Sequence, residues 1–300
     1  MKSVRFHRFG GPEVLEIEEV PEPRPGPGQI RIAVRAAGVN PIDWKKRQGL
    51  MGGKPPQSLG QDAAGVVDQV GRGVVDVSVG ARVFGFSATS SAQSELTIMS
   101  EYEPMPPSLS FEDAAALPTA IETAARALDE TGVEKGTVVL VNGASGGVGS
   151  SSVQLAVARG AHVIGIASPA NHDYLRSLQA EPVAYGEGLV DRVRALAPEG
   201  VDVALDLAGN GVIPDLIELA GGTERVLTIA DYEQARKYGV TFSDGKGGRA
   251  VHILGEIGEL IEDGRFALPV ARTFPLSDVA EAHRTSEQGH VRGKLVLLVR

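Results

Sequence analysis

The sequence predicts an α/β chain in which a strand-rich first part precedes a doubly wound parallel sheet. Three observations support this fold class. Alternating and valine-rich segments fill the first part, helical and short apolar segments alternate from Ala114 onward, and a glycine-rich loop joins one strand to a helix. We expect a first domain over 1–117, a second over 118–264, and a return of 265–300 to the first.

The first 117 residues have the patterns of strands. Pro21, Pro23, Pro25 and Pro27 disfavour a helix before Gln29, because proline lacks the N–H that an interior helical position donates. Alternating or β-branched segments follow at 29–37, 63–70, 74–77 and 82–86. We therefore expect an irregular β-barrel or a curved sheet in this part.

The second part alternates between helices and strands. Helical periodicity covers 111–128, and a helix of small residues covers 150–159. Strands are expected at 137–141, 162–167, 182–185, 201–207, 224–229 and 240–242. Because helix-length intervals separate most of these strands, they predict parallel βαβ units.

The last part has a helix and then a return toward strands. An amphipathic helix with apolar residues from Val251 to Ile261 follows Gly248. A strand at 270–274, a helix at 277–288 and a strand at 294–299 come next. The final strand is apolar enough to be buried on both faces, which suits a tail that rejoins the first domain.

Composition and charge exclude several classes of protein. The chain carries 29 basic and 38 acidic side chains, a net charge of −9, and this balance disfavours a nucleic-acid partner. It contains no cysteine, which excludes disulfide frameworks, thiolate zinc sites and cysteine nucleophiles. No apolar stretch reaches the roughly eighteen residues that cross a membrane. We expect a cytoplasmic protein with no membrane or nucleic-acid partner.

The glycine loop at 139–149, VLVNGASGGVG, is the most informative segment. Glycines permit a tight turn and let backbone amides approach a pyrophosphate, and the following helix adds amides and a positive dipole end. The strand, the helix and the next strand stand at the spacing of a dinucleotide site. The predicted cofactor residues here are Gly143, Ala144, Ser145, Gly146, Gly147 and Val148.

Two other interpretations of this loop stay open. The glycines could form only a connecting turn. The segment also fits the G-x-S-x-G pattern of a serine nucleophile, in which Ser145 would act with Asp206 and with His252 or His283. That pattern normally follows several βα units, whereas the residues ahead of it here have the patterns of a barrel.

The end of the second parallel strand bears on the choice of nicotinamide cofactor. Enzymes that use NAD commonly place a carboxylate there, and this chain has Ser168 and Asn171 without one. These two side chains could hydrogen-bond a 2′-phosphate, with His172 or Arg176 nearby, so NADP is favoured. The alternative is ordinary turn chemistry for both residues.

Several motifs, in order along the chain, resemble the zinc-independent quinone oxidoreductase branch of the medium-chain dehydrogenase/reductase superfamily. They are AGVNPID at 37–43, GQDAAGVV at 60–67, GARVFG at 80–85, ALP at 116–118, the glycine loop, and RGKLV at 292–296. The resemblance implies a GroES-like substrate domain over 1–117, a Rossmann NADP-binding domain over 118–264, and an active site between them.

The resemblance also implies chemistry without a metal. Zinc-dependent relatives carry Cys and His-Glu where this chain has Asn40 and Gln61-Asp62. Without a Lewis acid, a quinone or an α,β-unsaturated carbonyl is the expected hydride acceptor, because its developing charge delocalises. We expect an NADPH-dependent quinone or enone reductase. Because no general acid is evident, a catalytically silent NADP-binding redox sensor or scaffold stays open as the alternative.

The remaining site residues follow from the resemblance. Asn40 is expected near the nicotinamide and, with Asp43 on the short helix that follows, is the candidate catalytic residue. The further cofactor contacts that it implies are Thr123, Tyr185, Ala208 and Ala230.

Structural roles compete with some of these assignments. Asn40 could be only a turn residue and Asp43 only a helix cap. Lys45, Lys46 and Arg47 are expected to form a solvated face. The strand at 240–242 resembles a dimer-forming edge, so a homodimer is expected by analogy. The loop at 87–96 is shorter than in most relatives and leaves the substrate and the proton donor open.

Overall fold

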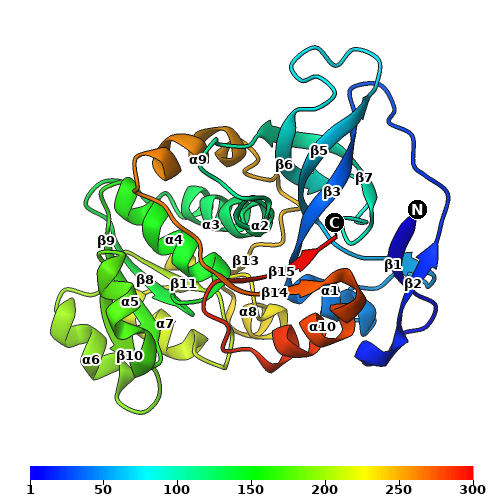
Figure 1. The fold of residues 1–300 in the computed structure, drawn as a ribbon. Helices are drawn as coiled ribbons and strands as arrows, with labels where there is room; N and C mark the ends of the chain where they lie inside the picture. The colour runs from blue at the N-terminus through cyan, green and yellow to red at the C-terminus, as the bar shows by residue number, and fades with distance from the viewer. Residues whose placement is uncertain (300) are drawn as a thin grey trace. The chain divides into compact units, whose positions relative to one another are not determined.

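The structure is a computed structural model that describes residues 1–299, and these residues form two compact units (Figure 1). Unit 1 contains Met1–Thr119, Leu254–Asp263 and the segment that starts at Ala267. Unit 2 contains Ala120–Ile253 and Gly264–Phe266. Each unit has its own hydrophobic core.

Unit 1 is built mainly from antiparallel strands. Its elements are β1 (Lys2–Phe6), a short 3-10 turn (Pro12–Val14), β2 (Leu15–Glu19), β3 (Ile30–Val39), α1 (Pro41–Arg47), β4 (Gln57–Ser58), β5 (Asp62–Val70), β6 (Arg82–Ser87), β7 (Leu96–Pro104), α2 (Phe111–Ala116), α9 (Ile253–Glu262), β14 (Val270–Pro275), a 3-10 turn (Leu276–Asp278), α10 (Val279–Gln288) and β15 (Lys294–Leu298). α9 starts one residue before the boundary of this unit.

The strands of unit 1 close into a barrel. One sheet has the order β14-β15-β3-β5-β6-β7, and an additional pairing of β3 with β7 joins its strands β3, β5, β6 and β7 into a ring. A separate three-stranded sheet has the order β2-β1-β4. β15 lies between β14 and β3, so the end of the chain completes the sheet of the first domain, as its apolar sequence predicts.

Unit 2 is a doubly wound parallel sheet. Its elements are α3 (Pro118–Glu130), which begins in unit 1, β8 (Val138–Asn142), α4 (Gly147–Ala158), β9 (His162–Ala167), a 3-10 turn (Pro169–Asn171), α5 (His172–Ser177), β10 (Glu181–Ala184), α6 (Leu189–Leu196), β11 (Val203–Asp206), α7 (Ile213–Ala220), a 3-10 turn (Thr223–Arg225), β12 (Val226–Thr228), α8 (Tyr232–Tyr238) and β13 (Thr241–Phe242). All its strand pairs are parallel, in the order β10-β9-β8-β11-β12-β13.

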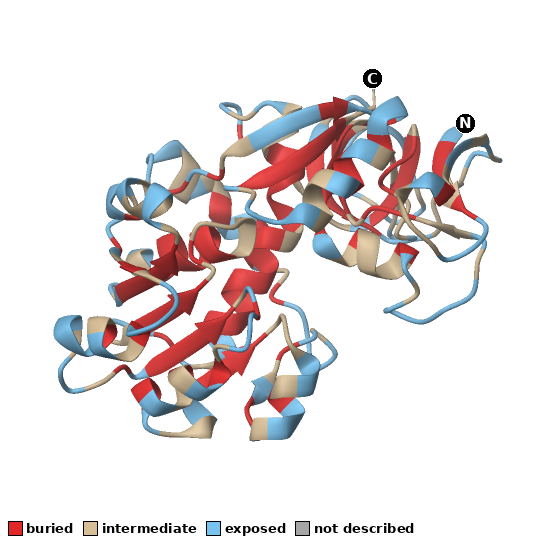
Figure 2. Ribbon diagram, turned by 90° about the horizontal axis from the view of Figure 1, so that it is seen from below, coloured by how far each residue is buried: buried red, intermediate tan, exposed pale blue. Residues whose placement is uncertain are grey.

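This strand order confirms the predicted α/β class. The order reverses between β8 and β11, and ligands of such sheets bind at the carboxyl ends of the strands beside that point. α4 packs on β8 and β9, while α6, α7 and α8 contact one another in a row (Figure 1). The inner strands β8, β11 and β12 are buried on both faces, which explains their continuous apolar sequences, whereas the edge strands β10 and β13 are partly exposed (Figure 2).

The structure corrects two of the predicted elements. The valine-rich segment 74–77 is a loop and not a strand, and Val75 is 94% exposed there. β-branched residues favour strands only where a partner strand and a core receive them. The helix expected at 111–128 is two helices, because Pro118 ends α2 and starts α3.

One helix lies in a different unit from the one expected. The expected division gave 118–264 to the second domain, whereas Leu254–Asp263 clusters with unit 1. The contacts of α9 explain this placement, since Ser108 donates a hydrogen bond of 2.7 Å from its Oγ to Glu262.

No helix within residues 1–299 is both long enough and apolar enough to traverse a bilayer.

Candidate functional site

The glycine loop of unit 2 needs glycine at two positions for different reasons. Gly143 follows β8 with φ of 79°, and a Cβ there would lie 2.7 Å from the Cβ of Ala208. A Cβ on Gly149 would lie 2.0 Å from the carbonyl oxygen of Gly143. Real side chains do not approach so closely. The first turn of α4 therefore packs against the end of β8 only with glycine at both positions.

The start of α4 offers backbone donors that the chain does not use. Gly146 is the N-cap and has no side-chain oxygen, so no cap satisfies the first turn. Within residues 1–299, no protein group accepts a hydrogen bond from the N–H of Gly147, Val148 or Gly149. These amides and the positive end of a 12-residue helix fit a pyrophosphate.

Three of the predicted cofactor residues meet beside this turn. The Asn171 Nδ2 donates to Ser145 Oγ at 3.2 Å and to Ser168 Oγ at 3.1 Å. The nearby carboxylate of Asp173 is paired with Arg176 at 2.6 Å. The cluster is therefore neutral and rich in hydroxyl and amide groups. Such a set can hydrogen-bond a 2′-phosphate without repelling it.

The other predicted cofactor contacts of unit 2 lie at strand ends or in α3. Tyr185 follows β10 and is 59% exposed, while Ala208 follows β11 and Ala230 follows β12. Thr123 is buried in α3, where its hydroxyl donates to Glu122 at 3.3 Å.

A buried polar row supports these strand ends, and the sequence did not single it out. Asp206 accepts from Asn142 Nδ2 at 2.8 Å and from Thr228 Oγ1 at 2.8 Å, and it also accepts from the N–H of Gly209. The row joins the carboxyl ends of β8, β11 and β12. A polar residue at the last position of each of these strands is the only sequence signal that could have predicted it.

The serine-nucleophile interpretation loses its supporting residues. The side-chain contact of Ser145 is with Asn171, and Asp206 is occupied by Asn142 and Thr228. His252 lies 3.7 Å from Asp129, and His283 is buried in unit 1. The proposed acid and both proposed bases thus hydrogen-bond or pair with other residues.

In unit 1, Asn40 and Asp43 form the start of α1. Pro41 occupies the first helical position, and the Asp43 carboxylate accepts from the N–H of Asn40 at 2.8 Å. The same carboxylate accepts from the N–H of Gly60 at 3.2 Å, which ties α1 to the loop before β5. Asp43 therefore has the capping contacts that its structural interpretation requires, and it is 2% exposed.

Asn40 belongs to a buried ionic network with residues from distant parts of the chain. Its Nδ2 donates to Asp62 at 2.9 Å, and the ammonium of Lys294 donates to its Oδ1. Lys294 also lies 3.7 Å from Asp62, whose other oxygen accepts from the N–H and hydroxyl of Thr119. Asn40, Asp62 and Lys294 are all buried, so the network fixes the orientation of the Asn40 carboxamide.

Burial changes the acid–base properties of this network. The pKa of the Asp43 carboxyl is raised to about 6, because burial and the charge of Asp62 outweigh the hydrogen bonds from Asn40 and Gly60 and the charge of Lys294. Burial lowers the pKa of the Lys294 ammonium, while Asp62 and Asp43 oppose that shift.

The charged run after Asp43 is not the solvated face that the sequence predicts. Arg47 is fully buried, where it donates to the Gly10 carbonyl and His283 Nδ1 and pairs with Glu287. Burial, together with the charge of Arg47, lowers the pKa of His283 to about 3. The 3.6-residue period of α1 turns Arg47 toward α10, which the run of like charges hides.

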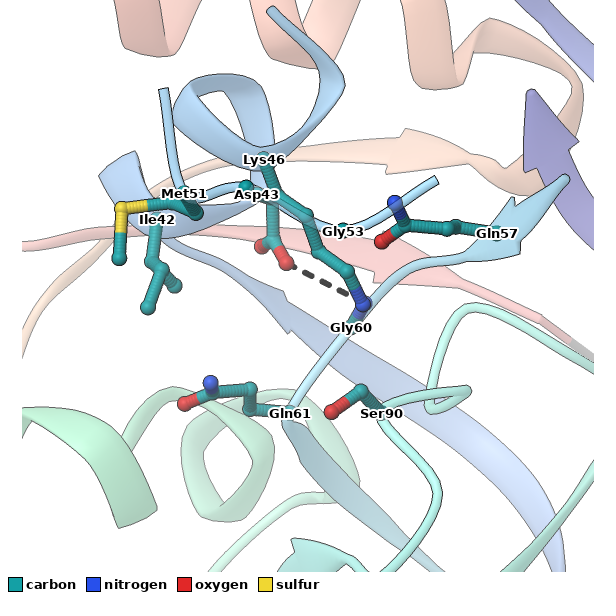
Figure 3. Close-up of a pocket in the computed structure, with 10 residues that line it drawn as sticks. Ile42, Asp43, Lys46, Met51, Gly53, Gln57, Gly60, Gln61 and Ser90 are labelled. Carbon is teal, nitrogen blue, oxygen red and sulfur yellow. Dashed lines mark hydrogen bonds between the residues drawn. The ribbon is translucent and has the colours of Figure 1, made fainter. Parts of the chain in front are cut away.

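A pocket of about 240 Å³ lies beside α1 within unit 1 (Figure 3). Asp43 and Lys46 from α1 line it together with Gln61, which precedes β5. Lys46 is half-buried and donates to the Ser58 carbonyl at 3.2 Å.

The residues of unit 1 do not fit a catalytic zinc ion. Beside Asn40 and Asp62, the Lys294 ammonium already supplies the positive charge. Within residues 1–299, three candidate ligand side chains approach one another only at His7, Glu16 and Glu18, on the exposed hairpin of β1 and β2. Neither the charge balance nor the donor set near Asn40 suits a divalent metal.

Two models of known families match separate parts of the chain. Residues 26–107 match the family model of the alcohol dehydrogenase GroES-like domain. Residues 178–297 match the family model described as zinc-binding dehydrogenase.

Known proteins match over the full chain. The quinone oxidoreductases of Rattus norvegicus and Homo sapiens are each 30% identical over 322 residues, which covers 100% of this chain and 98% of each relative. The solved quinone oxidoreductase of Escherichia coli, complexed with NADPH, is 27% identical with a TM-score of 0.87 and covers 100% of both chains. The solved quinone oxidoreductase of Coxiella burnetii is 32% identical with a TM-score of 0.85, and the match covers 100% of this chain and 99% of that one.

Proposed function

We propose the function of this chain from one premise: it belongs to the zinc-independent quinone oxidoreductase branch of the medium-chain dehydrogenase/reductase superfamily. This membership confirms the resemblance of the motifs, and it makes the chain an oxidoreductase. More specifically, we propose an NADPH-dependent reductase of quinones or α,β-unsaturated carbonyl compounds that works without a metal ion. The observation that carries this proposal is the unused set of amides at the glycine loop, with Ser168 and Asn171 beside it.

Each part of the loop has a defined role in this proposal. The amides of Gly147, Val148 and Gly149 would bind the pyrophosphate of the cofactor, and Ser168 with Asn171 would bind the 2′-phosphate. When bound, NADPH supplies a hydride. The buried row through Asp206 holds the ends of three strands at fixed separation, so the loop is organised before the cofactor arrives.

The residues of unit 1 support a reaction without a metal ion. Lys294 occupies the acceptor oxygens of Asn40 and Asp62 that could otherwise ligate a metal ion, so the polarisation of a substrate oxygen falls to hydrogen-bond donors. Such donors stabilise less charge than a Lewis acid does. Acceptors that spread the incoming charge over a conjugated system are therefore favoured over simple ketones. Asn40 and Asp43 stay proposals as catalytic residues, with Asn40 held rigidly and Asp43 in the pocket wall.

The proposal is tested by the loss of NADPH absorbance with a panel of naphthoquinones, benzoquinones and enals. We expect reduction of at least one class, and slower reduction of simple ketones. Tight NADPH binding with no turnover of any member would contradict the reductase and favour the silent redox sensor or scaffold.

The homodimer and the cytoplasmic location expected from the sequence also stay proposals. β13 is the edge strand of the parallel sheet and has one unpaired side, which supports pairing with a second copy of the chain. The Ser243 N–H donates to Thr228 of β12, so the N–H of Phe242, one residue earlier, faces the free edge. Sedimentation equilibrium of the wild type and of Phe242→Pro tests the dimer, because proline removes that outward donor.

A further inference from the structure

The pocket beside α1 has walls of opposite character. Ile42 and Met51 supply apolar surface, whereas Lys46, Gln57, Gln61 and Ser90 supply polar groups (Figure 3). A pocket with one apolar wall and a few polar groups suits a flat conjugated ligand that also carries a polar substituent.

Lys46 is an incompletely satisfied cation in this pocket. Its ammonium makes one hydrogen bond, to the neutral Ser58 carbonyl at 3.2 Å, so two of its three protons have no protein acceptor within residues 1–299. Burial lowers the pKa of this ammonium, and the nearby charge of Asp43 opposes that shift only in part. An anion in the pocket would supply the missing compensation.

Gln57 provides a second unused donor. Its Nε2 is buried and has no hydrogen-bond partner among residues 1–299. Gly53 makes room for this amide, because a Cβ at that position would lie 2.8 Å from Nε2. A buried donor without an acceptor costs stability, about 1–3 kcal/mol in general, unless a ligand or water completes it.

The one carboxylate that lines the pocket is already engaged. The two oxygens of Asp43 accept from the backbone amides of Asn40 and Gly60. The Ser58 carbonyl accepts from Lys46. The unsatisfied groups of the pocket are thus the Lys46 ammonium and the Gln57 Nε2, and both are complemented by a ligand group with several acceptor oxygens and a negative charge.

We propose that this pocket binds an acidic substituent of the electron acceptor through the Lys46 ammonium and the Gln57 carboxamide, so that quinones or enones bearing a carboxylate are preferred. This proposal rests on the proposed function, since it names the substrate class of the same reductase. It also gives the pocket a preference for acidic acceptors, which membership of the family does not imply.

The test compares a neutral naphthoquinone with its derivative that carries a carboxylate on the non-quinone ring. In the wild type we expect the acid to have the lower KM. In Lys46→Met the preference for the acid, as a ratio of kcat/KM values, should fall at least about tenfold, as expected for the loss of one charge-assisted hydrogen bond. Lys46→Arg should recover part of the preference, and Gln57→Leu should lose a smaller part.

Lys45→Met is the matched control. Lys45 neighbours Lys46 in the same helix but lies over the Trp44 ring, 5.7 Å from its centroid, and does not line the pocket. It should keep the wild-type preference. A Lys46→Met preference that equals the wild type, in a variant with the wild-type melting temperature, would overturn the proposal.

A binding measurement separates this proposal from the proposed function. Trp44 is the single tryptophan and belongs to α1, so its fluorescence reports binding of each naphthoquinone without cofactor. If no acceptor is reduced but the acid binds in a Lys46-dependent way, the reductase fails and the pocket stands. If both naphthoquinones are reduced and bound alike by the wild type and Lys46→Met, the reductase stands and the pocket assignment fails.

Discussion

The two units present their binding groups in different ways. The glycine loop of unit 2 offers backbone amides, and its few polar side chains are neutral. The region around α1 in unit 1 instead depends on ionisable side chains, with Asp43, Asp62, Lys294, Arg47 and His283 all buried. A backbone site depends on the absence of side chains, whereas a buried ionic site depends on every partner being present. The two units should therefore respond differently to mutation and to pH.

The largest expected effect follows from adding a single methyl group to the loop. In Gly149→Ala the new Cβ would lie 2.0 Å from the Gly143 carbonyl oxygen, so the turn must open. We expect NADPH binding to fall at least about a hundredfold, since several amide contacts are lost together. Fluorescence titration of NADPH measures it. Gly247→Ala is the control, because a Cβ there meets nothing within 4 Å, and wild-type affinity in Gly149→Ala would refute the backbone site.

The next effect concerns the charge balance of unit 1. Lys294→Met leaves Asp62 buried without its cation, and we expect the free energy of unfolding to fall by about 3–5 kcal/mol. Urea unfolding followed by Trp44 fluorescence measures this loss in unit 1. The double variant with Asp62→Asn should recover part of it. A single variant that unfolds at the wild-type urea concentration would show that the network has no net role.

The third effect is the acid sensitivity that His283 gives to unit 1. Its pKa of about 3 lies below the ordinary 6.5, so the unfolded chain binds the proton more readily and stability is lost as pH falls from 6.5 toward 3. Between pH 7 and pH 4 the loss is about 3 kcal/mol. His283→Gln keeps an acceptor for Arg47, and it should not lose this stability between pH 7 and pH 4.

Asp43 acts in the opposite direction over part of the same range. Its pKa is raised to about 6, so the folded state binds the proton more readily and stability from this group falls as pH rises from 4 to 6. The wild type should therefore have a flatter pH profile than either variant alone. Urea unfolding of the wild type, His283→Gln and Asp43→Asn from pH 4 to pH 7 separates the contributions of His283 and Asp43 to the free energy of unfolding. If this free energy depended on pH in the same way in all three proteins, both assignments would be contradicted.

The smallest effect tests the choice of cofactor. Ser168→Asp places a carboxylate beside Asn171, where it would repel a 2′-phosphate. We expect the ratio of NADPH to NADH affinity to fall about tenfold, with the binding of NADH less affected. Ser177→Asp, on the exposed end of α5, is the control. An unchanged ratio in Ser168→Asp would remove Ser168 from the cofactor site.

The same contrast explains what the sequence could predict. The glycine loop is a contiguous pattern whose geometry depends on glycine at fixed spacing, so strand, turn and helix were predictable together. The cluster of Ser145, Ser168 and Asn171 was also accessible, because parallel strands bring their carboxyl ends to one edge. The buried row through Asp206 was not, since polar residues at strand ends are common.

The network of unit 1 was beyond prediction for a different reason. Asn40 and Lys294 are separated by 254 positions and meet only because β15 pairs with β3. The apolar strand at 294–299 was expected to be buried, but its sequence does not reveal the partners of Lys294. Arg47 and Lys46 were misplaced because a run of charges predicts a solvated face and does not reveal the two sides of a short helix.

The place of β15 in the sheet has a consequence for the order in which the chain folds during synthesis. β3 pairs with β15, a strand that is translated more than 250 residues later. The last strand of unit 2, in contrast, ends at Phe242. The half of the enzyme that is made in the middle can therefore mature first. Unit 1 contains the first residues of the chain and is completed last. Its incomplete barrel, with the edge of β3 unpaired, is therefore the folding intermediate that is exposed longest to chaperones.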